Sequence, residues 1–157
     1  MTQQQVMSLA DIIAHGHMEP RHKLRLWIDI LRAVAAKHRE GVCFGSLNPQ
    51  AILIDMRNFI LPMEAPLDPE SPYTAPELKL GAAPNEQSDI YSLGVMLFEL
   101  LTGSLEGLHR SPPSRVAKDV PRWIDAVVLR CIMRKRGQRY LDLDEIAQEF
   151  QRLKSVL

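Results

Sequence analysis

The feature that most constrains the fold is one segment, residues 89–101, which has almost no polar face. It reads Asp-Ile-Tyr-Ser-Leu-Gly-Val-Met-Leu-Phe-Glu-Leu-Leu and is followed by Gly103. A helix that is apolar on nearly every side must be surrounded by other elements, and a glycine just beyond it is a common helix end. We therefore predict a buried central helix around which the rest of the chain packs.

The composition allows such a core within a single domain. The chain has 157 residues, and a chain of this length buries roughly two-thirds of its unfolded surface. Its 19 Lys and Arg balance its 19 Asp and Glu, so no bulk charge favours nucleic acid or an anionic membrane. No apolar run approaches the roughly 20 residues that span a bilayer. Cys43 and Cys131 lie in apolar stretches, as expected of thiols in a reducing compartment, so we expect a cytoplasmic protein.

Helical signals continue on the N-terminal side of the central segment. Ser8 and Asp11 form a capping-box pattern that predicts a short helix, and Pro20 begins a long amphipathic stretch that ends at Gly41. Further helices are predicted over residues 123–134 and from about residue 142. These patterns predict a mainly α domain.

Between the helices, two short apolar runs at residues 52–54 and 59–61 predict one small β-hairpin. Residues 62–76 contain five prolines and predict a loop. We expect residues 1–7 to be a disordered or hinge-like start and residues 8–157 to form the domain.

Two motifs near the central helix suggest a family. Residues 73–77 read Tyr-Thr-Ala-Pro-Glu, and residues 88–94 read Ser-Asp-Ile-Tyr-Ser-Leu-Gly. In this order they resemble the eukaryotic-like protein kinase family, in which an Ala-Pro-Glu segment precedes a buried helix. The resemblance covers the chain from about Ser8 to its end. It implies a kinase C-terminal lobe with the N-terminal lobe absent, because no glycine-rich phosphate loop or strand lysine precedes Ser8.

The resemblance also implies two structural roles. Arg139 stands where the family has an arginine that pairs with the glutamate of Ala-Pro-Glu, here Glu77, as a largely buried ion pair. Asp89 stands where an aspartate holds the backbone of the loop at residues 44–46 by hydrogen bonds.

The positions that carry the family's chemistry differ from its pattern. Residues 44–51 align with the catalytic loop, whose usual form is His-Arg-Asp-Leu, three residues and Asn. Ser46 replaces the aspartate that accepts the substrate proton, Asn48 replaces the usual lysine, and Ala51 replaces the metal-binding asparagine. A serine hydroxyl is too weak a base near neutral pH, and a methyl group has no lone pair for a metal.

The metal-binding Asp-Phe-Gly triplet should follow the second strand, but the chain reads Pro62-Met63-Glu64 there. Glu64 offers a carboxylate, yet both usual protein ligands of Mg²⁺ are replaced. We therefore expect no catalytic residue, no cofactor and no metal, and a non-catalytic pseudokinase lobe that acts as a scaffold or regulatory module. The alternative is an ATP-dependent Ser/Thr protein kinase-type phosphotransferase that an upstream segment or partner chain completes. The residues at positions 46 and 51 argue against it.

A lower lobe without an upper one would leave apolar residues uncovered near the hairpin. The candidates are Leu53, Phe59, Leu61, Met63 and Met96. Contiguous exposed apolar area commonly marks an interaction site. We expect self-association or a protein partner on the face that an N-terminal lobe normally covers, with no nucleic acid and no membrane insertion.

Four groups have a functional interpretation beside a structural one that we favour. Ser46 could act as a nucleophile, but the sequence shows no base in a recognisable relation to it. Basic residues at the end of a helix could bind phosphate, but we expect them to complement the helix dipole. Clustered histidines are common in polar loops, and hydroxyls in this segment commonly pack rather than become phosphorylated. The groups other than Ser46 are Arg134, Lys135 and Arg136 for phosphate, His15, His17 and His22 for a metal, and Tyr73 and Thr74 for phosphorylation.

Overall fold

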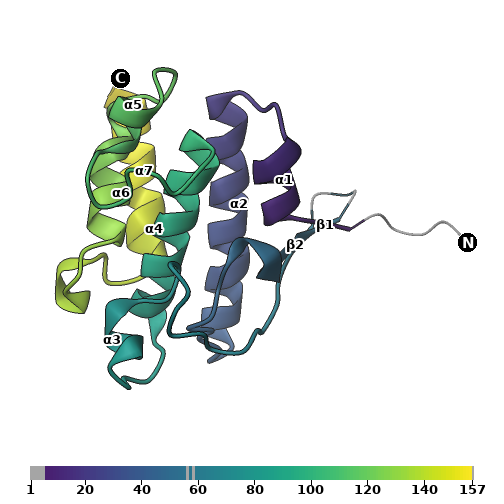
Figure 1. Cartoon of the computed structure of the whole chain (residues 1–157), viewed down its shortest axis with the longest axis vertical. Coiled ribbons are helices and arrows are strands. Elements are labelled where there is room, and N and C mark those ends of the chain that lie inside the picture. Colours follow the sequence, from purple (N-terminus) through teal and green to yellow (C-terminus); the bar gives the residue numbers. More distant parts are fainter. Residues whose placement is uncertain (1–5, 56, 58, 157) are drawn as a thin grey trace, which may run out of the picture.

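Helices form the body of the computed structural model, and a small sheet projects from one side of it (Figure 1). The structure describes residues 6–55, 57 and 59–156. The helices are α1 (Leu9–His15), α2 (Pro20–Arg39), α3 (Pro76–Lys79), α4 (Glu86–Thr102), α5 (Pro113–Val116), α6 (Ile124–Cys131) and α7 (Leu143–Val156), with 3-10 turns η1 (Pro49–Ala51) and η2 (Arg136–Gln138). The strands are β1 (Met7–Ser8), β2 (Ile52–Ile54) and β3 (Ile60–Pro62). The predicted mainly α fold with a small hairpin is confirmed.

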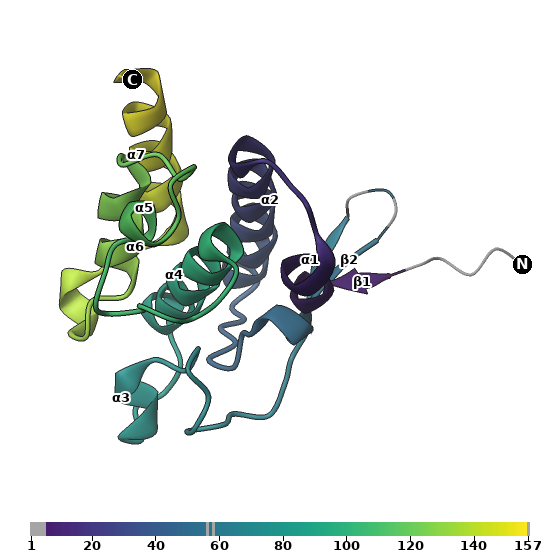
Figure 2. The same cartoon turned by 45° about the horizontal axis from the view of Figure 1, so that its top comes forward.

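Helix α4 is the predicted central helix. It begins with a capping box between Asn85 and Ser88 and ends at Gly103, whose φ of 87° is the left-handed conformation that favours glycine. It lies between α2 on one side and α5 and α6 on the other (Figure 2). Gly94 allows the close approach of α6, since a Cβ there would collide with Cys131. The core therefore sits around α4, as its apolar sequence requires.

Helix α2 supports α4 along its length. Pro20 occupies its first turn, and its buried face includes Trp27, Ile30 and Val34. The indole N–H of Trp27 donates to the carbonyl of Leu93 at 3.0 Å, which fixes α2 against α4 by a buried hydrogen bond. None of the helices described combines the length and the hydropathy that crossing a bilayer requires.

The sheet is antiparallel with strand order β1-β2-β3. The hairpin pairs Leu53 with Leu61, and β1 adds a strand that we did not predict by pairing Met7 with Ile54. A two-residue strand is too short to leave a periodic signal. Residues 1–5 of the expected disordered start lie outside the described residues. Met7 belongs to the sheet, so ordered structure begins before the expected boundary at Ser8.

Candidate functional site

The loop at residues 44–46 is anchored by Asp89 at the start of α4. The backbone N–H groups of Phe44 and Gly45 donate to the Asp89 carboxylate at 2.9 and 2.7 Å. The Nε2 atom of His38 lies 2.8 Å from the same carboxylate, and the Asp89 side chain is fully buried. Three elements, α2, the loop and α4, therefore meet at one carboxylate. The sequence indicated the loop contacts through the kinase resemblance but gave no sign of the His38 contact.

A second buried polar contact joins Glu77 of α3 to Arg139. The guanidinium donates to both carboxylate oxygens, at 2.6 and 2.9 Å, and also to the carbonyls of Met133, Gln87 and Arg134. The Arg139 side chain is 0% exposed, so each of these bonds replaces water. Burial alone would raise the pKa of Glu77, but the hydrogen bonds and charge of Arg139 outweigh it and hold that pKa below its ordinary value.

Ser46 and Asn48 hold the loop together from within. The Ser46 hydroxyl donates to the carbonyl of Phe44 at 3.4 Å, and Ser46 is 8% exposed. The side-chain Oδ1 of Asn48 accepts from the N–H groups of Gln50 and Ala51 and so caps η1. An asparagine directly before a proline at the first helical position is a common cap, so this role could have been predicted from the sequence.

Residues at the expected metal position lie beside the loop, at the end of β3. Ala51 is 7% exposed, and its carbonyl accepts from the N–H of Met63 at 2.7 Å. Pro62 is buried against the body, and Glu64 is exposed. The structure therefore brings the backbone of Ala51 next to that of Met63, in the Pro62–Glu64 segment.

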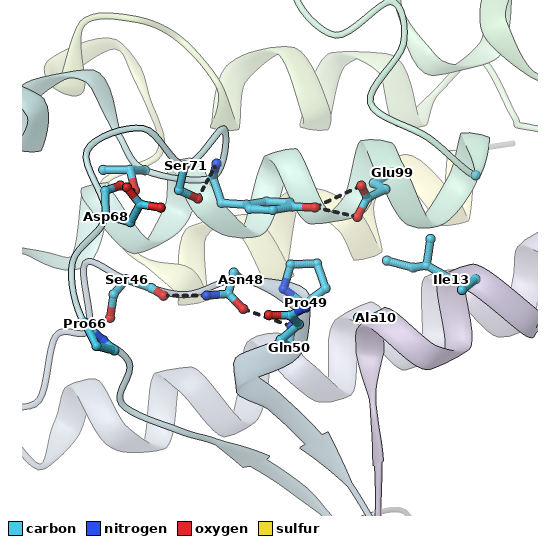
Figure 3. A pocket seen from close by; sticks show the side chains of 14 residues that line it. Ala10, Ile13, Ser46, Asn48, Pro49, Gln50, Pro66, Asp68, Ser71 and Glu99 are labelled. Atoms are coloured by element: carbon cyan, nitrogen blue, oxygen red, sulfur yellow. Dashed lines mark hydrogen bonds between the residues drawn. The ribbon is translucent and has the colours of Figure 1, made fainter.

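A hollow of about 520 Å³ opens beside the loop (Figure 3). In Figure 3, Ser46, Asn48, Pro49 and Gln50 form one wall, Asp68, Ser71 and Glu99 face them, and Ala10 and Ile13 of α1 close one end. The remaining lining residues are Ala14, Pro66, Tyr73, Thr74 and Gly103.

The polar groups of the hollow are mostly engaged within the protein. The Tyr73 hydroxyl donates to both carboxylate oxygens of Glu99, at 2.8 and 2.9 Å. Burial and then the Glu99 carboxylate raise the pKa of Tyr73. The Thr74 hydroxyl donates to the carbonyl of Asp68. Among the described residues that line the hollow, the hydroxyls of Ser46, Ser71 and Thr74 have backbone groups as their hydrogen-bond partners, and Tyr73 is the hydroxyl that bonds to a carboxylate.

Four of the five apolar partner candidates lie together on the sheet. Alternate positions along β3 and just beyond its two ends are occupied by Phe59, Leu61 and Met63, which are 62%, 49% and 47% exposed. The partly buried Leu53 pairs with Leu61. Met96 was wrongly included, because it is 0% exposed inside α4. A helix that is apolar on every side does not reveal which residue faces outward.

The suggested histidine cluster does not form a metal site among the described residues. His15, His17 and His22 are exposed, and the described residues contain a single group of at least three His, Cys, Asp or Glu ligands within metal-binding range. That group is formed by His38, Cys43 and Asp89. The spacing of these three in the sequence gave no signal, because three different elements bring them together.

Comparison with known proteins agrees with the fold. No family model matches the chain. It is 26% identical to the serine/threonine-protein kinase PknB of Mycolicibacterium smegmatis over 94% of its own length, and 27% identical to PrkC of Bacillus subtilis over 82%. The crystal structure of the Mycobacterium tuberculosis PknI kinase domain matches 96% of the chain with a TM-score of 0.80 and 20% identity.

The chain corresponds to only part of the length of each of these relatives. The chain spans 29% of PknB, 24% of PrkC and 63% of the PknI kinase domain. The sequence matches, the helical body around α4 and the small sheet together place the chain in the protein kinase-like superfamily, as the counterpart of a kinase C-terminal lobe.

Proposed function

We propose that this kinase-like lobe does not transfer phosphate and acts as a protein-binding scaffold or regulatory module. The observation that carries the proposal is the environment of Ser46, at the position of the proton-accepting aspartate. Its hydroxyl is nearly buried and donates to Phe44 within its own loop. A hydroxyl has no appreciable basicity near pH 7, whereas a catalytic base works best with a pKa near the working pH.

The metal positions support the same proposal. Phosphoryl transfer depends on Mg²⁺ ions that bridge the phosphates and neutralise developing charge. Ala51 presents a methyl group and Pro62 and Met63 present no oxygen ligand in their side chains, so Glu64 is the one carboxylate of the segment. One exposed carboxylate is a weak site for a cation that prefers octahedral oxygen ligands. The anchoring contacts of Asp89 and Arg139 stabilise the lobe without serving this chemistry.

A phosphotransfer assay tests the catalytic part of the proposal. We would incubate the purified chain, and the full gene product, with radiolabelled ATP, Mg²⁺ and a general protein substrate. We expect no label above that of a heat-denatured sample, and no rise in melting temperature with Mg·ATP. A tight ligand at about 100 times its dissociation constant would stabilise the fold by about 2.7 kcal/mol. Label transfer that Ser46→Ala or Glu64→Gln abolishes would contradict the proposal.

For the binding part, we propose that the exposed sheet face of Leu53, Phe59, Leu61 and Met63 contacts a second copy of the chain. The face is apolar and strand-built, and β3 is an edge strand of the described sheet. The formal net charge is zero, so two copies do not repel each other through bulk charge. An isologous contact needs one patch that is complementary to itself, which an alternating apolar face provides.

Light scattering during size-exclusion chromatography tests this contact. We expect the mass to rise towards that of a dimer with concentration, and Leu61→Glu to return it to that of a monomer. Leu80→Glu is the matched control, because Leu80 is 90% exposed but lies after α3, away from the sheet. A monomer at all concentrations would reject self-association and leave the absence of phosphate transfer to be judged by the label assay.

A further inference from the structure

Three side chains that can bind a metal meet beneath the loop at residues 44–46. His38 comes from the last turn of α2, Cys43 from the segment after it, and Asp89 from the first turn of α4. A ring nitrogen, the sulfur and a carboxylate oxygen all lie within 4.8 Å of one another. The proposed absence of phosphate transfer has no bearing on this group, because none of its three residues lines the hollow beside the loop.

We propose that His38, Cys43 and Asp89 bind a divalent transition metal ion, with Zn²⁺ as the best match. Zinc takes thiolate, imidazole and carboxylate ligands at about 2.0 to 2.3 Å, so tetrahedral ligand atoms lie roughly 3.4 to 3.6 Å apart. Since the three ligand atoms already lie within 4.8 Å of one another, no separation would have to shorten by more than about 1.4 Å, and the 2.8 Å between His38 and Asp89 would lengthen as the ion enters between them. Soft thiolate disfavours Mg²⁺ and Ca²⁺, which prefer oxygen.

The imidazole of His38 is available for a metal. Its side chain is 4% exposed, and Nδ1 is the one buried side-chain nitrogen or oxygen of the described residues without a hydrogen-bond partner. A buried polar atom without a partner is costly and calls for an explanation. Nδ1 makes no hydrogen bond, so binding an ion through Nδ1 would give up no existing partner of that nitrogen, and the contact that a rotation of the ring would break is that of Nε2 with Asp89. The nitrogen that does not bind metal can then donate to a carboxylate, as is common for metal-binding histidines.

The charges around the group favour a cation. Burial and then the charges of Asp89 and Glu86 raise the pKa of the Cys43 thiol in the metal-free protein. The same two carboxylates attract a divalent ion, which would in turn stabilise the thiolate. A hollow of about 110 Å³ beside His38 is also lined by Glu86, Asp142 and Asp144. Arg39 is the opposing positive charge there and lies 3.7 Å from Asp144.

A bound ion would join α2, the loop and α4 at the place where Asp89 already holds the loop backbone. Asp89 can keep the N–H groups of Phe44 and Gly45 while one of its oxygens also contacts the ion, because each carboxylate oxygen has two lone pairs. The metal would therefore stabilise the loop conformation rather than create a catalytic centre.

Zinc titration of the reduced chain, freed of metal with a chelator, tests the site by calorimetry. We expect one Zn²⁺ per chain, and Cys43→Ser to weaken its dissociation constant by at least about tenfold. The matched control is Cys131→Ala, which removes the other thiol, and a second control replaces His15, His17 and His22 by glutamine. With Co²⁺ as the probe, a thiolate-to-metal absorption band should appear in the wild type and be absent from Cys43→Ser.

Circular dichroism of each variant before titration separates lost binding from lost folding, and Cys43 is partly exposed, so Ser is readily accommodated. Three results would overturn the site. One is the absence of stoichiometric binding to the wild type, and another is unchanged affinity in folded Cys43→Ser. The third is loss of binding in the histidine-to-glutamine control, which would assign the ion to the exposed histidines.

Discussion

The base of the loop at residues 44–46 and its outer side differ in how their polar groups are satisfied. By the base we mean two fully buried side chains, Asp89, which holds the loop backbone, and Arg139, which holds Glu77 of α3, and their partners are protein atoms at 2.6 to 3.2 Å. On the outer side, Ser46 makes one long bond of 3.4 Å, and the neighbouring sheet exposes Phe59 and Leu61. The base resembles the interior of a domain, whereas the outer side combines the nearly buried Ser46, which has few partners, with exposed apolar residues of the sheet.

This difference indicates which interactions the fold depends on. Buried charges are stable only when paired and hydrogen-bonded, so losing one partner at the base leaves a charge that water cannot reach. A side chain on the outer side can change with little consequence for folding. A lobe with an intact base can therefore stay stable although its chemical positions are replaced. Substitutions at the base should lower the free energy of unfolding more than substitutions on the outer side.

The largest effect should come from Arg139→Met. It leaves Glu77 without its bidentate partner and three carbonyls without a donor. We expect the free energy of unfolding to fall by about 3–5 kcal/mol in urea denaturation. Arg39→Met is the control, because its ion pair is long and exposed, and surface pairs contribute about 0–1 kcal/mol. Equal losses in the two variants would remove the distinction between base and surface.

Asp89→Asn should rank second. An amide keeps the size of the carboxylate but places N–H donors against the N–H groups of Phe44 or Gly45. We expect the free energy of unfolding to fall by about 2–3 kcal/mol, because a buried N–H donor is left unsatisfied and a charged acceptor is lost. The measurement is again urea denaturation, with Asp144→Asn as the exposed control. Faster amide hydrogen exchange at Phe44 and Gly45 in Asp89→Asn than in the wild type would show that the lost stability comes from the loop.

Sequence reasoning succeeded where a short string determines a local structure. The apolar run of α4, the capping box of Ser8 and Asp11 and the hairpin each follow from neighbouring residues, and the structure has all three. The contact of Glu77 with Arg139 was suggested by a family resemblance and could not be read from spacing, because the two residues are far apart in the chain.

The remaining features depend on packing between distant elements. The sequence placed Met96 among the candidates for the exposed face, but Met96 is buried. The neighbours that pack around α4 decide which side of this apolar helix is covered. The meeting of His38 and Cys43 with Asp89 depends on how α2 lies against α4. The β1 strand forms because β2 offers an edge, which two residues of sequence cannot indicate.

The stability of the buried pair of Glu77 and Arg139 should also depend on pH. The pKa of Glu77 is held below its ordinary value, so the folded state favours the charged carboxylate. Its contribution is complete above the pKa of the unfolded state, near the ordinary value of 4.5, and is lost as the pH falls through the folded pKa. Wild-type stability should therefore fall more steeply than that of Glu77→Gln as the pH falls below 4.5.

Urea denaturation of both proteins at each pH gives the difference between their free energies of unfolding. The exposed carboxylates are the same in both proteins, so their contributions cancel in this difference. The effect should be smaller than that of Arg139→Met, because protonation neutralises Glu77 but leaves its side chain in place. Parallel stability curves for the two proteins would mean that Glu77 titrates as it does in the unfolded chain.

The smallest effect should come from Ser46→Ala, on the outer side. The change removes a single hydrogen bond whose length of 3.4 Å lies near the limit for such bonds. The backbone of Ser46 keeps its bond from the Asn48 side chain, and the loop keeps the two bonds to Asp89. We expect the free energy of unfolding to change by no more than about 0.5 kcal/mol in urea denaturation. A loss comparable to that of Asp89→Asn would mean that the serine is a structural anchor in its own right, and its replacement of a catalytic aspartate would then have a folding explanation.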